Sequence, residues 1–276
     1  MTTVAEPHRA QPDDDATDPQ LEAIGPVVEK DRAALIRTIS IVVVLGLWEV
    51  LGRQVNPLLL SYPSKILQAL WSMMLSGEIF QAILESGKTL LLGFLLATVI
   101  GVALGLLIGR YRSVEAATDW LVNALYATPL VAIVPLVTLW FGLGFSAKLF
   151  IVCIIAVFPI LINTASGVRN VSSSFIDVGR AFAATERETF VKIIMPAALP
   201  YVMTGLRLGI GRCIIGMVVA EFYTAVGGLG ALIMKYGNQY DTAAMFVPIL
   251  TLALIGVLLT ALVRRAELYF APWKAN

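Results

Sequence analysis

Residues 89–109 read TLLLGFLLATVIGVALGLLIG, and this run of 21 residues without a charge lies between Lys88 and Arg110. About 20 apolar residues, each rising about 1.5 Å along a helix, cover the roughly 30 Å of hydrocarbon in a bilayer. The stretch therefore predicts a helix that crosses a membrane. It also contains a small residue at every fourth position, and this spacing predicts a face on which another helix packs closely. The small residues are Gly93, Ala97, Gly101, Gly105 and Gly109.

Five further segments have the length and composition of membrane-spanning helices. Residues 120–147, 149–168 and 242–263 carry no charge, whereas 35–51 and 198–222 carry a few charges. The whole chain of 276 residues is 58% hydrophobic and 14% charged, against about 25% charged in soluble proteins. We therefore predict an all-α integral membrane protein with six spans. The net charge of +1 gives no indication of a nucleic-acid partner.

The distribution of Lys and Arg predicts the orientation, because basic residues are retained on the cytoplasmic side of short loops. With the N-terminus inside, thirteen basic residues fall on the cytoplasmic side and five fall outside, when Arg207 and Arg212 are counted as intramembrane. Both termini are expected in the cytoplasm. Residues 1–34 hold eight acidic and three basic residues and are expected to form a disordered cytoplasmic tail. Residues 35–276 would then form the transmembrane domain.

The loop at residues 169–196 is the most highly charged segment between two predicted spans. Ser174 with Asp177, and Thr185 with Glu188, have the spacing of a capping box. Two amphipathic helices are expected, at about 175–183 and 186–195. Spacing alone leaves two interpretations open: a helical hairpin lying at the membrane interface, or a segment that binds a soluble partner.

Charged and polar residues inside the spans are candidates for a substrate pathway, because ionisable groups within a membrane usually face protein or water. Arg212 and Glu221 are nine positions apart and lie on opposite faces of one helix, so they cannot pair with each other. A structural ion pair or a lipid headgroup contact is the alternative role of each arginine, and a bond to a neighbouring backbone is the alternative for the polar residues. The candidates are Arg207, Arg212, Glu221, Asn163 and Thr128.

Several motifs resemble the permease subunits of ABC importers, in particular the nitrate/sulfonate/taurine branch. The loop aligns with the signature E-A-A-x-x-x-G-x(9)-I-x-L-P, in which Ile193 and Pro196 match, Asp177 keeps the acid and Met195 keeps the bulk. The resemblance extends over about residues 40–273. Its other motifs include Thr128-Pro129-Leu130-Val131-Ala132, Leu139-Trp140-Phe141-Gly142-Leu143-Gly144, Phe158-Pro159-Ile160-Leu161, Val219-Ala220-Glu221 and Gly227-Gly228-Leu229-Gly230.

The resemblance implies that the 169–196 loop is a coupling element that docks into a groove of a separate ATPase subunit. The family glycine falls at Ala183, where a positive φ would cost about 1 kcal/mol. Either the turn shifts to Ala184-Thr185, or its geometry differs. The residues expected to contribute to coupling are Asp177, Gly179, Arg180, Ala183, Ala184, Phe190, Ile193 and Pro196.

The function implied is the permease subunit of an ATP-driven importer in a bacterial inner membrane, carrying a small anion such as a sulfonate, taurine or nitrate. ATP and Mg would be used by the partner ATPase, since the chain has no phosphate-loop motif. The other expected partners are an extracytoplasmic substrate-binding protein, a second permease copy and membrane lipid. Pyrimidine precursors of vitamins are also carried by relatives. The alternative is a secondary transporter or channel driven by an ion gradient; a membrane-embedded enzyme is disfavoured because the spans contain no histidine.

Overall fold

The computed structural model describes residues 25–224 and 226–270, and the regular elements of this part of the chain are all helices. The chain divides into two compact units, residues 1–51 and 52–276. Helix α2 (Gly25–Gln54) makes up the described part of the first unit and has the length and composition of a membrane span. Of the expected tail, residues 1–34, the first 24 lie outside the described residues. Residues 25–34 belong to α2, which begins at Gly25.

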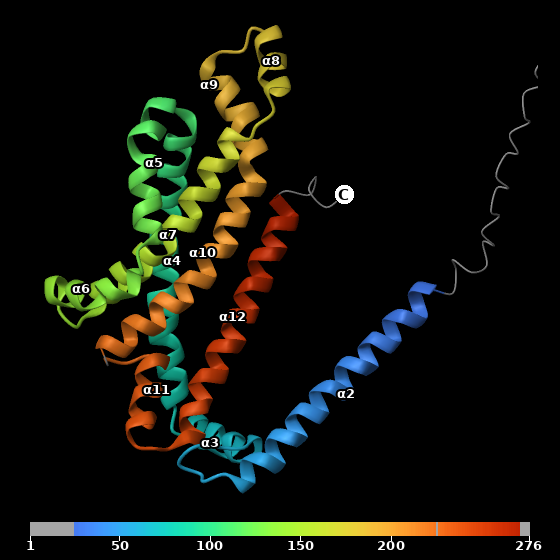
Figure 1. Ribbon diagram of the computed structural model, residues 1–276, viewed down its shortest axis with the longest axis vertical. Coiled ribbons are helices and arrows are strands. Elements are labelled where there is room, and N and C mark those ends of the chain that lie inside the picture. The colour runs from blue at the N-terminus through green and yellow to red at the C-terminus, as the bar shows by residue number, and fades with distance from the viewer. Residues whose placement is uncertain (1–24, 225, 271–276) are drawn as a thin grey trace, which may run out of the picture. The chain divides into compact units, whose positions relative to one another are not determined.

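Helix α7 (Phe145–Arg169) is the centre of the second unit. It packs along α4 (Glu78–Arg110) and along α10 (Met195–Thr224), as Figure 1 shows. The predicted small-residue stripe of α4 forms the first of these interfaces and is confirmed as a packing face. A Cβ added to any of its glycines would lie between 2.5 and 2.9 Å from α7. The contacting pairs are Gly93 and Val152, Gly101 and Ile160, Gly105 and Thr164, and Gly109 and Val168.

In these pairs the residue numbers of α4 and α7 increase together, so the two helices run parallel. The contacts between α7 and α10 advance in opposite directions. Gly209 of α10 lies against Ile160 of α7, whereas Gly216 lies against Ile155, nearer the start of α7. Glycine lets the two backbones approach closely. Three helices are therefore held together with little side-chain volume between them.

The third predicted span, residues 120–147, is formed by a bent pair of helices rather than by one continuous helix. Helix α5 (Arg112–Ala127) is followed by a bend of 84° and then by η1 (Leu130–Ile133) and α6 (Val134–Phe141). The break lies at Thr128 and Pro129. The pyrrolidine ring of a proline disfavours helical geometry in the residue before it, and Thr128 is extended, with ψ of 134°. The described residues thus contain five single-helix spans, or six if the bent pair crosses the membrane.

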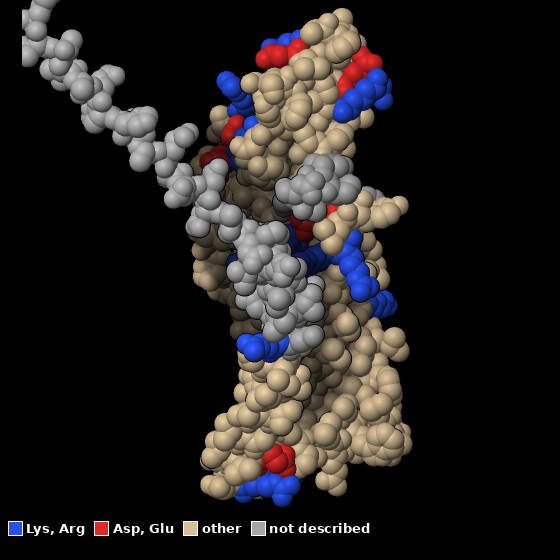
Figure 2. All heavy atoms as spheres, turned by 90° about the vertical axis from the view of Figure 1, so that its right-hand side faces the viewer, with Lys and Arg blue, Asp and Glu red and all other residues tan. Residues whose placement is uncertain are grey.

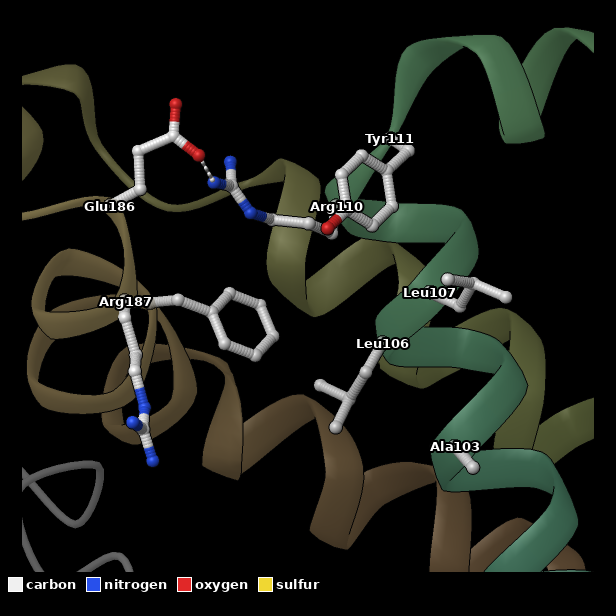
Figure 3. A pocket seen from close by; sticks show the side chains of 8 residues that line it. Ala103, Leu106, Leu107, Arg110, Tyr111, Glu186 and Arg187 are labelled. Carbon is white, nitrogen blue, oxygen red and sulfur yellow. Dashed lines mark hydrogen bonds and ion pairs between the residues drawn. The ribbon is translucent and has the colours of Figure 1, made fainter.

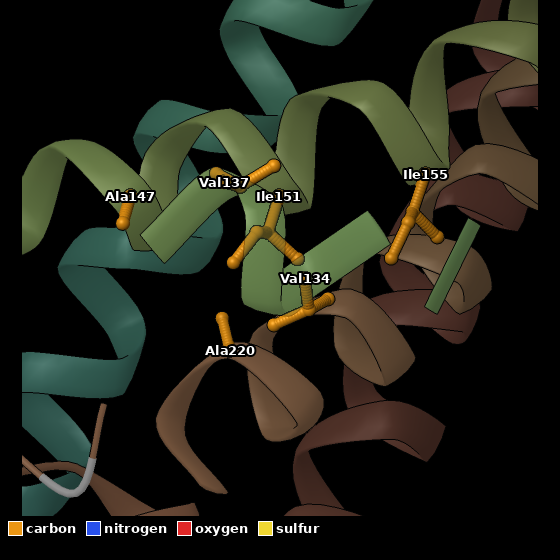
Figure 4. Close-up of a cluster of buried hydrophobic side chains, with 6 residues drawn as sticks. All are labelled: Val134, Val137, Ala147, Ile151, Ile155 and Ala220. Atoms are coloured by element: carbon orange, nitrogen blue, oxygen red, sulfur yellow. The ribbon is translucent and has the colours of Figure 1, made fainter. Parts of the chain in front are cut away.

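The short helix α6 is fixed to the bundle by a buried apolar cluster (Figure 4). Val134 and Val137 of α6 are fully buried, and both pack in this cluster with side chains of α7 and with Ala220 of α10. In Figure 4 the α7 side chains Ala147, Ile151 and Ile155 lie beside the two valines. The broken segment is therefore anchored to the bundle although its path bends.

The remaining helices lie at the two ends of the second unit (Figure 1). At one end are α8 (Ser173–Ala181), α9 (Glu186–Thr189) and the π-helical turn η2 (Phe190–Ile194). At the other end are α3 (Pro63–Leu75) and α11 (Leu229–Asn238). Helix α12 (Thr242–Phe270) packs against α3, α10 and α11.

Candidate functional site

The loop at residues 169–196 folds as a helical hairpin, which we call the α8–η2 hairpin (residues 173–194). Helix α8 is followed by a turn, and α9, η2 and α10 then form one helical stretch from Glu186 to Thr224. The two expected helices are thus present. The second of them does not end near residue 195 but continues as the span.

One of the two predicted capping boxes is confirmed. Glu188 N donates to Thr185 Oγ1 at 3.2 Å, and Thr185 N donates to Glu188 Oε2 at 3.1 Å. The predicted box at Ser174 was wrong, because α8 begins at Ser173, two residues earlier than expected, with Ser172 at the cap position and Ser174 inside the helix. Asp177 pairs instead with Arg180 at 3.2 Å.

The turn between the two helices has the geometry that usually requires glycine. Ala183 has a φ of 52°, so the alternative that shifts the turn to Ala184-Thr185 was wrong. Ala184 N donates to Gly179 O and Ala183 N donates to Arg180 O, both at 2.9 Å. These are the two bonds of the Schellman motif that ends many helices. A left-handed alanine costs about 1–2 kcal/mol, so the turn stores strain at an exposed position.

Helix α8 is fastened to η2 by a close contact at Gly179. This glycine is buried, and an added Cβ would lie 2.8 Å from Ile193 Cδ1. Ile194, the next residue of η2, is buried in a cluster with Val168 and Ala198, against which Phe190 packs. Pro196 follows in the first turn of α10. The hairpin is therefore packed on α7 and α10 rather than hanging from them.

A face of α8 next to this contact is apolar and uncovered. Phe175, Val178 and Phe182 are 56%, 55% and 84% exposed. Their spacing of three and four residues places them on one face, which we call the α8 stripe. Figure 2 shows charged side chains on both sides of an uncharged surface at the tip formed by α8 and α9. An apolar strip with a charged rim is typical of a surface that another protein covers.

Three of the intramembrane candidates have partners within the chain. Arg207 Nη2 donates to Glu267 Oε2 of α12 at 2.7 Å. Asn163 Nδ2 donates to the carbonyl oxygen of Pro159 at 2.8 Å, and Thr128 Oγ1 donates to that of Ala124 at 2.9 Å. The last two bonds are to the residue four positions earlier in the same helix.

Glu221 has a structural role in a buried polar network. It is fully buried, accepts a hydrogen bond from Ser86 Oγ at 2.7 Å and accepts one from Gly230 N at 2.8 Å. Ser86 Oγ in turn accepts from Leu229 N at 2.8 Å. The carboxylate thus satisfies free amides at the start of α11, where the helix dipole also favours a negative charge.

Two lysines complete this end of the bundle. Lys148, which is only 5% exposed, donates from Nζ to the carbonyl oxygens of Val226 at 2.5 Å and Gly227 at 3.0 Å. Lys235 donates to Glu78 at 2.5 Å, and this hydrogen bond raises the pKa of Lys235 above its ordinary value. Neither Ser86 nor Lys148 is among the residues expected from the sequence to form a site.

Arg212 differs from the other candidates. It is exposed near the middle of α10 and makes no hydrogen bond or ion pair with the residues that the structure describes. Leu208 and Ile215, on the same face, are 52% and 51% exposed, and nothing lies within 4 Å of a Cβ added to Gly211. This α10 face, made up of Leu208, Gly211, Arg212 and Ile215, is therefore uncovered in the single chain.

Residues 97–275 match the family described as "Binding-protein-dependent transport system inner membrane component". The chain belongs to this family. It is thus a permease subunit of a binding-protein-dependent ABC importer, a multi-pass inner-membrane component that performs no catalysis itself.

Several permeases whose names mention different cargoes are similar to this chain over most of its length. The nitrate import permease NrtB of Leptolyngbya laminosa is 31% identical, over 87% of this chain and 89% of its own. The formylaminopyrimidine transport permease ThiX of Halalkalibacterium halodurans is 30% identical, over 90% and 99%. A Bacillus subtilis protein named as an aliphatic sulfonates transport permease, SsuC, is 32% identical, over 84% and 85%.

A solved structure shows the same fold. The chain from inward-facing conformations of the MetNI methionine ABC transporter matches with a TM-score of 0.55 and 21% identity. The match covers 72% of the permease and 98% of that chain. The all-helical membrane fold predicted from the sequence is confirmed by this likeness and by the helices described above.

The expected coupling residues include none of the α8 stripe, although the spacing of Phe175, Val178 and Phe182 could have indicated it. Ile176, also apolar, is half-buried on the side of the helix that faces the permease. No local signal could have indicated Ser86, because it lies 135 positions from Glu221 in the sequence.

Proposed function

We propose that the α8–η2 hairpin is the surface through which the permease binds its ATPase subunit. The observation that carries the proposal is the α8 stripe, an uncovered apolar strip on a hairpin that is rigidly capped and packed. Asp177 and Arg180 form an ion pair on the exposed charged side of α8, Gly179 and Ile193 join the two halves of the hairpin, and Ala183 and Ala184 form its turn. Phe190 and Pro196 lie where the hairpin continues into α10.

The hairpin is suited to transmit movement because it is continuous with a span. A helix from Glu186 to Thr224 has 39 residues and is about 58 Å long at about 1.5 Å per residue. A displacement imposed on α9 is therefore carried along α10 through the membrane. In this proposal the partner subunit binds ATP and Mg. The distribution of basic residues predicts that the hairpin and both termini lie in the cytosol.

The cargo that we propose is a small anion delivered by an extracytoplasmic binding protein. The names of the relatives include nitrate and aliphatic sulfonates, both of which are anions. Arg212 supports this choice, because an unpaired cation within a membrane is costly unless it faces water, protein or an anion. Arg207 is already neutralised by Glu267. Of the two arginines, Arg212 is thus the one that is free to contact substrate.

The α10 face also supports the pairing of two identical copies. A single chain leaves Leu208 and Ile215 uncovered beside Arg212, and two such faces across a central pathway would shield the arginines from lipid. Asn163 and Thr128 are secondary candidates for the pathway, since both already bond to backbone oxygens. Glu221 is fully buried at the start of α11, and its role there is structural.

The coupling proposal is tested by Val178→Asp in the complete transporter, reconstituted in lipid vesicles with its ATPase and binding protein. A charge in the centre of the α8 stripe should lower ATPase co-purification and ATP-driven uptake by at least about tenfold, because binding surfaces depend on a few buried apolar residues. Ser173→Asp is the matched control. Ser173 is exposed on the same helix, on the face opposite the stripe, and its substitution should leave both measurements unchanged.

Full assembly and uptake by the Val178→Asp transporter would contradict the proposal. Uptake that continues without ATP and stops when the ion gradient is dissipated would instead support a secondary transporter.

A further inference from the structure

A cavity of about 490 Å³ lies between the end of α4 and the start of the α9–α10 helix (Figure 3). One wall is apolar and consists of Ala103, Leu106 and Leu107 of α4 together with Phe190 of η2. The lining also includes Arg110, Tyr111, Glu186 and Arg187. In Figure 3 the Arg187 side chain points away from Arg110. In Figure 3 the labelled α4 residues follow one another along a single helix toward Arg110.

The order of these residues along α4 matches the depth profile of a bilayer. Ala103 to Leu107 belong to the uncharged run 89–109, and Arg110 is the first charged residue after it. From Ala103 to Arg110 the helix rises about 10 Å. The apolar part of the cavity therefore lies at the depth of the acyl chains, and Arg110 lies at the depth of the headgroups.

The charges that line the cavity are only partly neutralised. Arg187 is exposed and makes no hydrogen bond or ion pair within the described part of the chain. Arg110 pairs with Glu186 at 3.0 Å, but the Glu186 side chain is 92% exposed. Exposed pairs of this kind are weak. Two guanidinium groups against one exchangeable carboxylate favour a ligand with a negative charge.

We propose that this cavity binds an anionic phospholipid of the surrounding leaflet. One acyl chain lies along Ala103, Leu106 and Leu107, the phosphate binds Arg110 in place of Glu186, and the exposed Arg187 side chain turns toward it. Arginine recognises phosphate through paired N–H donors, and basic pockets between spans bind anionic headgroups. The ligand would join α4 to the first turn of the hairpin helix, two elements that the Arg110–Glu186 pair already connects.

The test uses the whole transporter, purified in detergent and incubated with mixed phosphatidylcholine and phosphatidylglycerol, with the retained lipid measured by native mass spectrometry. Arg187→Gln should lower retained phosphatidylglycerol by about fivefold, the contribution expected of one basic residue near a lipid surface. Arg265→Gln is the matched control. Arg265 is an exposed arginine near the end of α12 that does not line the cavity, and its substitution should leave phosphatidylglycerol retention unchanged.

A second variant, Leu107→Trp, keeps both arginines and fills the apolar half of the cavity. It should also lower phosphatidylglycerol retention, so the proposal can be decided even if Arg187→Gln fails to assemble. Excess inorganic phosphate should not displace the lipid.

Three results would overturn the proposal: unchanged phosphatidylglycerol retention in both variants, equal retention of phosphatidylcholine, or displacement of the lipid by inorganic phosphate. The last would indicate a site for free anions. None of these results bears on the coupling role of the α8 stripe, which is tested separately.

Discussion

The two ends of the bundle differ in which side chains are buried and which are left uncovered. At the α11 end, Glu221, Ser86 and Lys148 are buried and hydrogen-bonded within the chain. At the hairpin end, Phe182 is 84% exposed and Arg187 has no partner among the described residues. Buried polar groups must be satisfied internally, whereas uncovered apolar groups indicate a surface that is completed by another molecule. The α11 end thus stabilises the fold, whereas the hairpin end offers a surface for binding another molecule.

The largest effect that we expect is the loss of the support at Glu221. Glu221→Ala would leave Ser86 Oγ without its carboxylate partner and Gly230 N buried without an acceptor. Leaving such groups unsatisfied should lower the free energy of unfolding by about 3 kcal/mol. The measurement is unfolding of the purified permease in mixed detergent micelles.

Glu186→Ala is the matched control at the other end. It removes a carboxylate that is 92% exposed, and its effect on stability should be below about 1 kcal/mol. If the two variants lost equal stability, the contrast between the ends would be wrong.

The next effect concerns binding rather than stability. Phe182→Ala removes the most exposed ring of the α8 stripe and should weaken assembly with the ATPase by about 2 kcal/mol, or roughly thirtyfold. The free energy of unfolding of the isolated permease should stay the same, because the exposed ring makes few contacts with the rest of the permease. A titration of ATPase subunit onto permease in nanodiscs measures the first quantity. A variant that unfolds more easily but binds normally would contradict the assignment of this end.

The smallest effect lies in the turn of the hairpin. Ala183→Gly relieves the left-handed alanine, whose φ is 52°, and should stabilise the hairpin by at most about 1 kcal/mol, since glycine also gains entropy in the unfolded chain. Slower hydrogen exchange of the amides of Ala183 and Ala184, which donate the two bonds of the turn, would report it. Ala184→Gly, one position later, provides the comparison and should stabilise nothing. Faster exchange in Ala183→Gly would show that the alanine is not strained.

The features that could be predicted from the sequence are those that depend on residues close together in the chain. The stripe from Gly93 to Gly109 and the cap at Thr185 could be read because each depends on a spacing of three or four residues. Charge and length do not indicate the break at Thr128, because they are the same for a straight and a bent span; Pro129 is the local signal for a bend there. The network at Glu221 joins residues far apart in the chain, and no spacing rule reaches that distance.

The central claim is that the hairpin and α10 move as one rigid body when the ATPase closes. Two spin labels at exposed positions, Ser173 on the hairpin and Leu208 on α10, measure this directly in the assembled transporter, since Cys153 and Cys213 are both buried. The account predicts that the distance between the two labels within one chain stays constant between nucleotide-free and ATP-bound states, while the distance between the Leu208 labels of the two copies changes. A change within one chain, with no change between the copies, would place a hinge between the hairpin and the span and would contradict it.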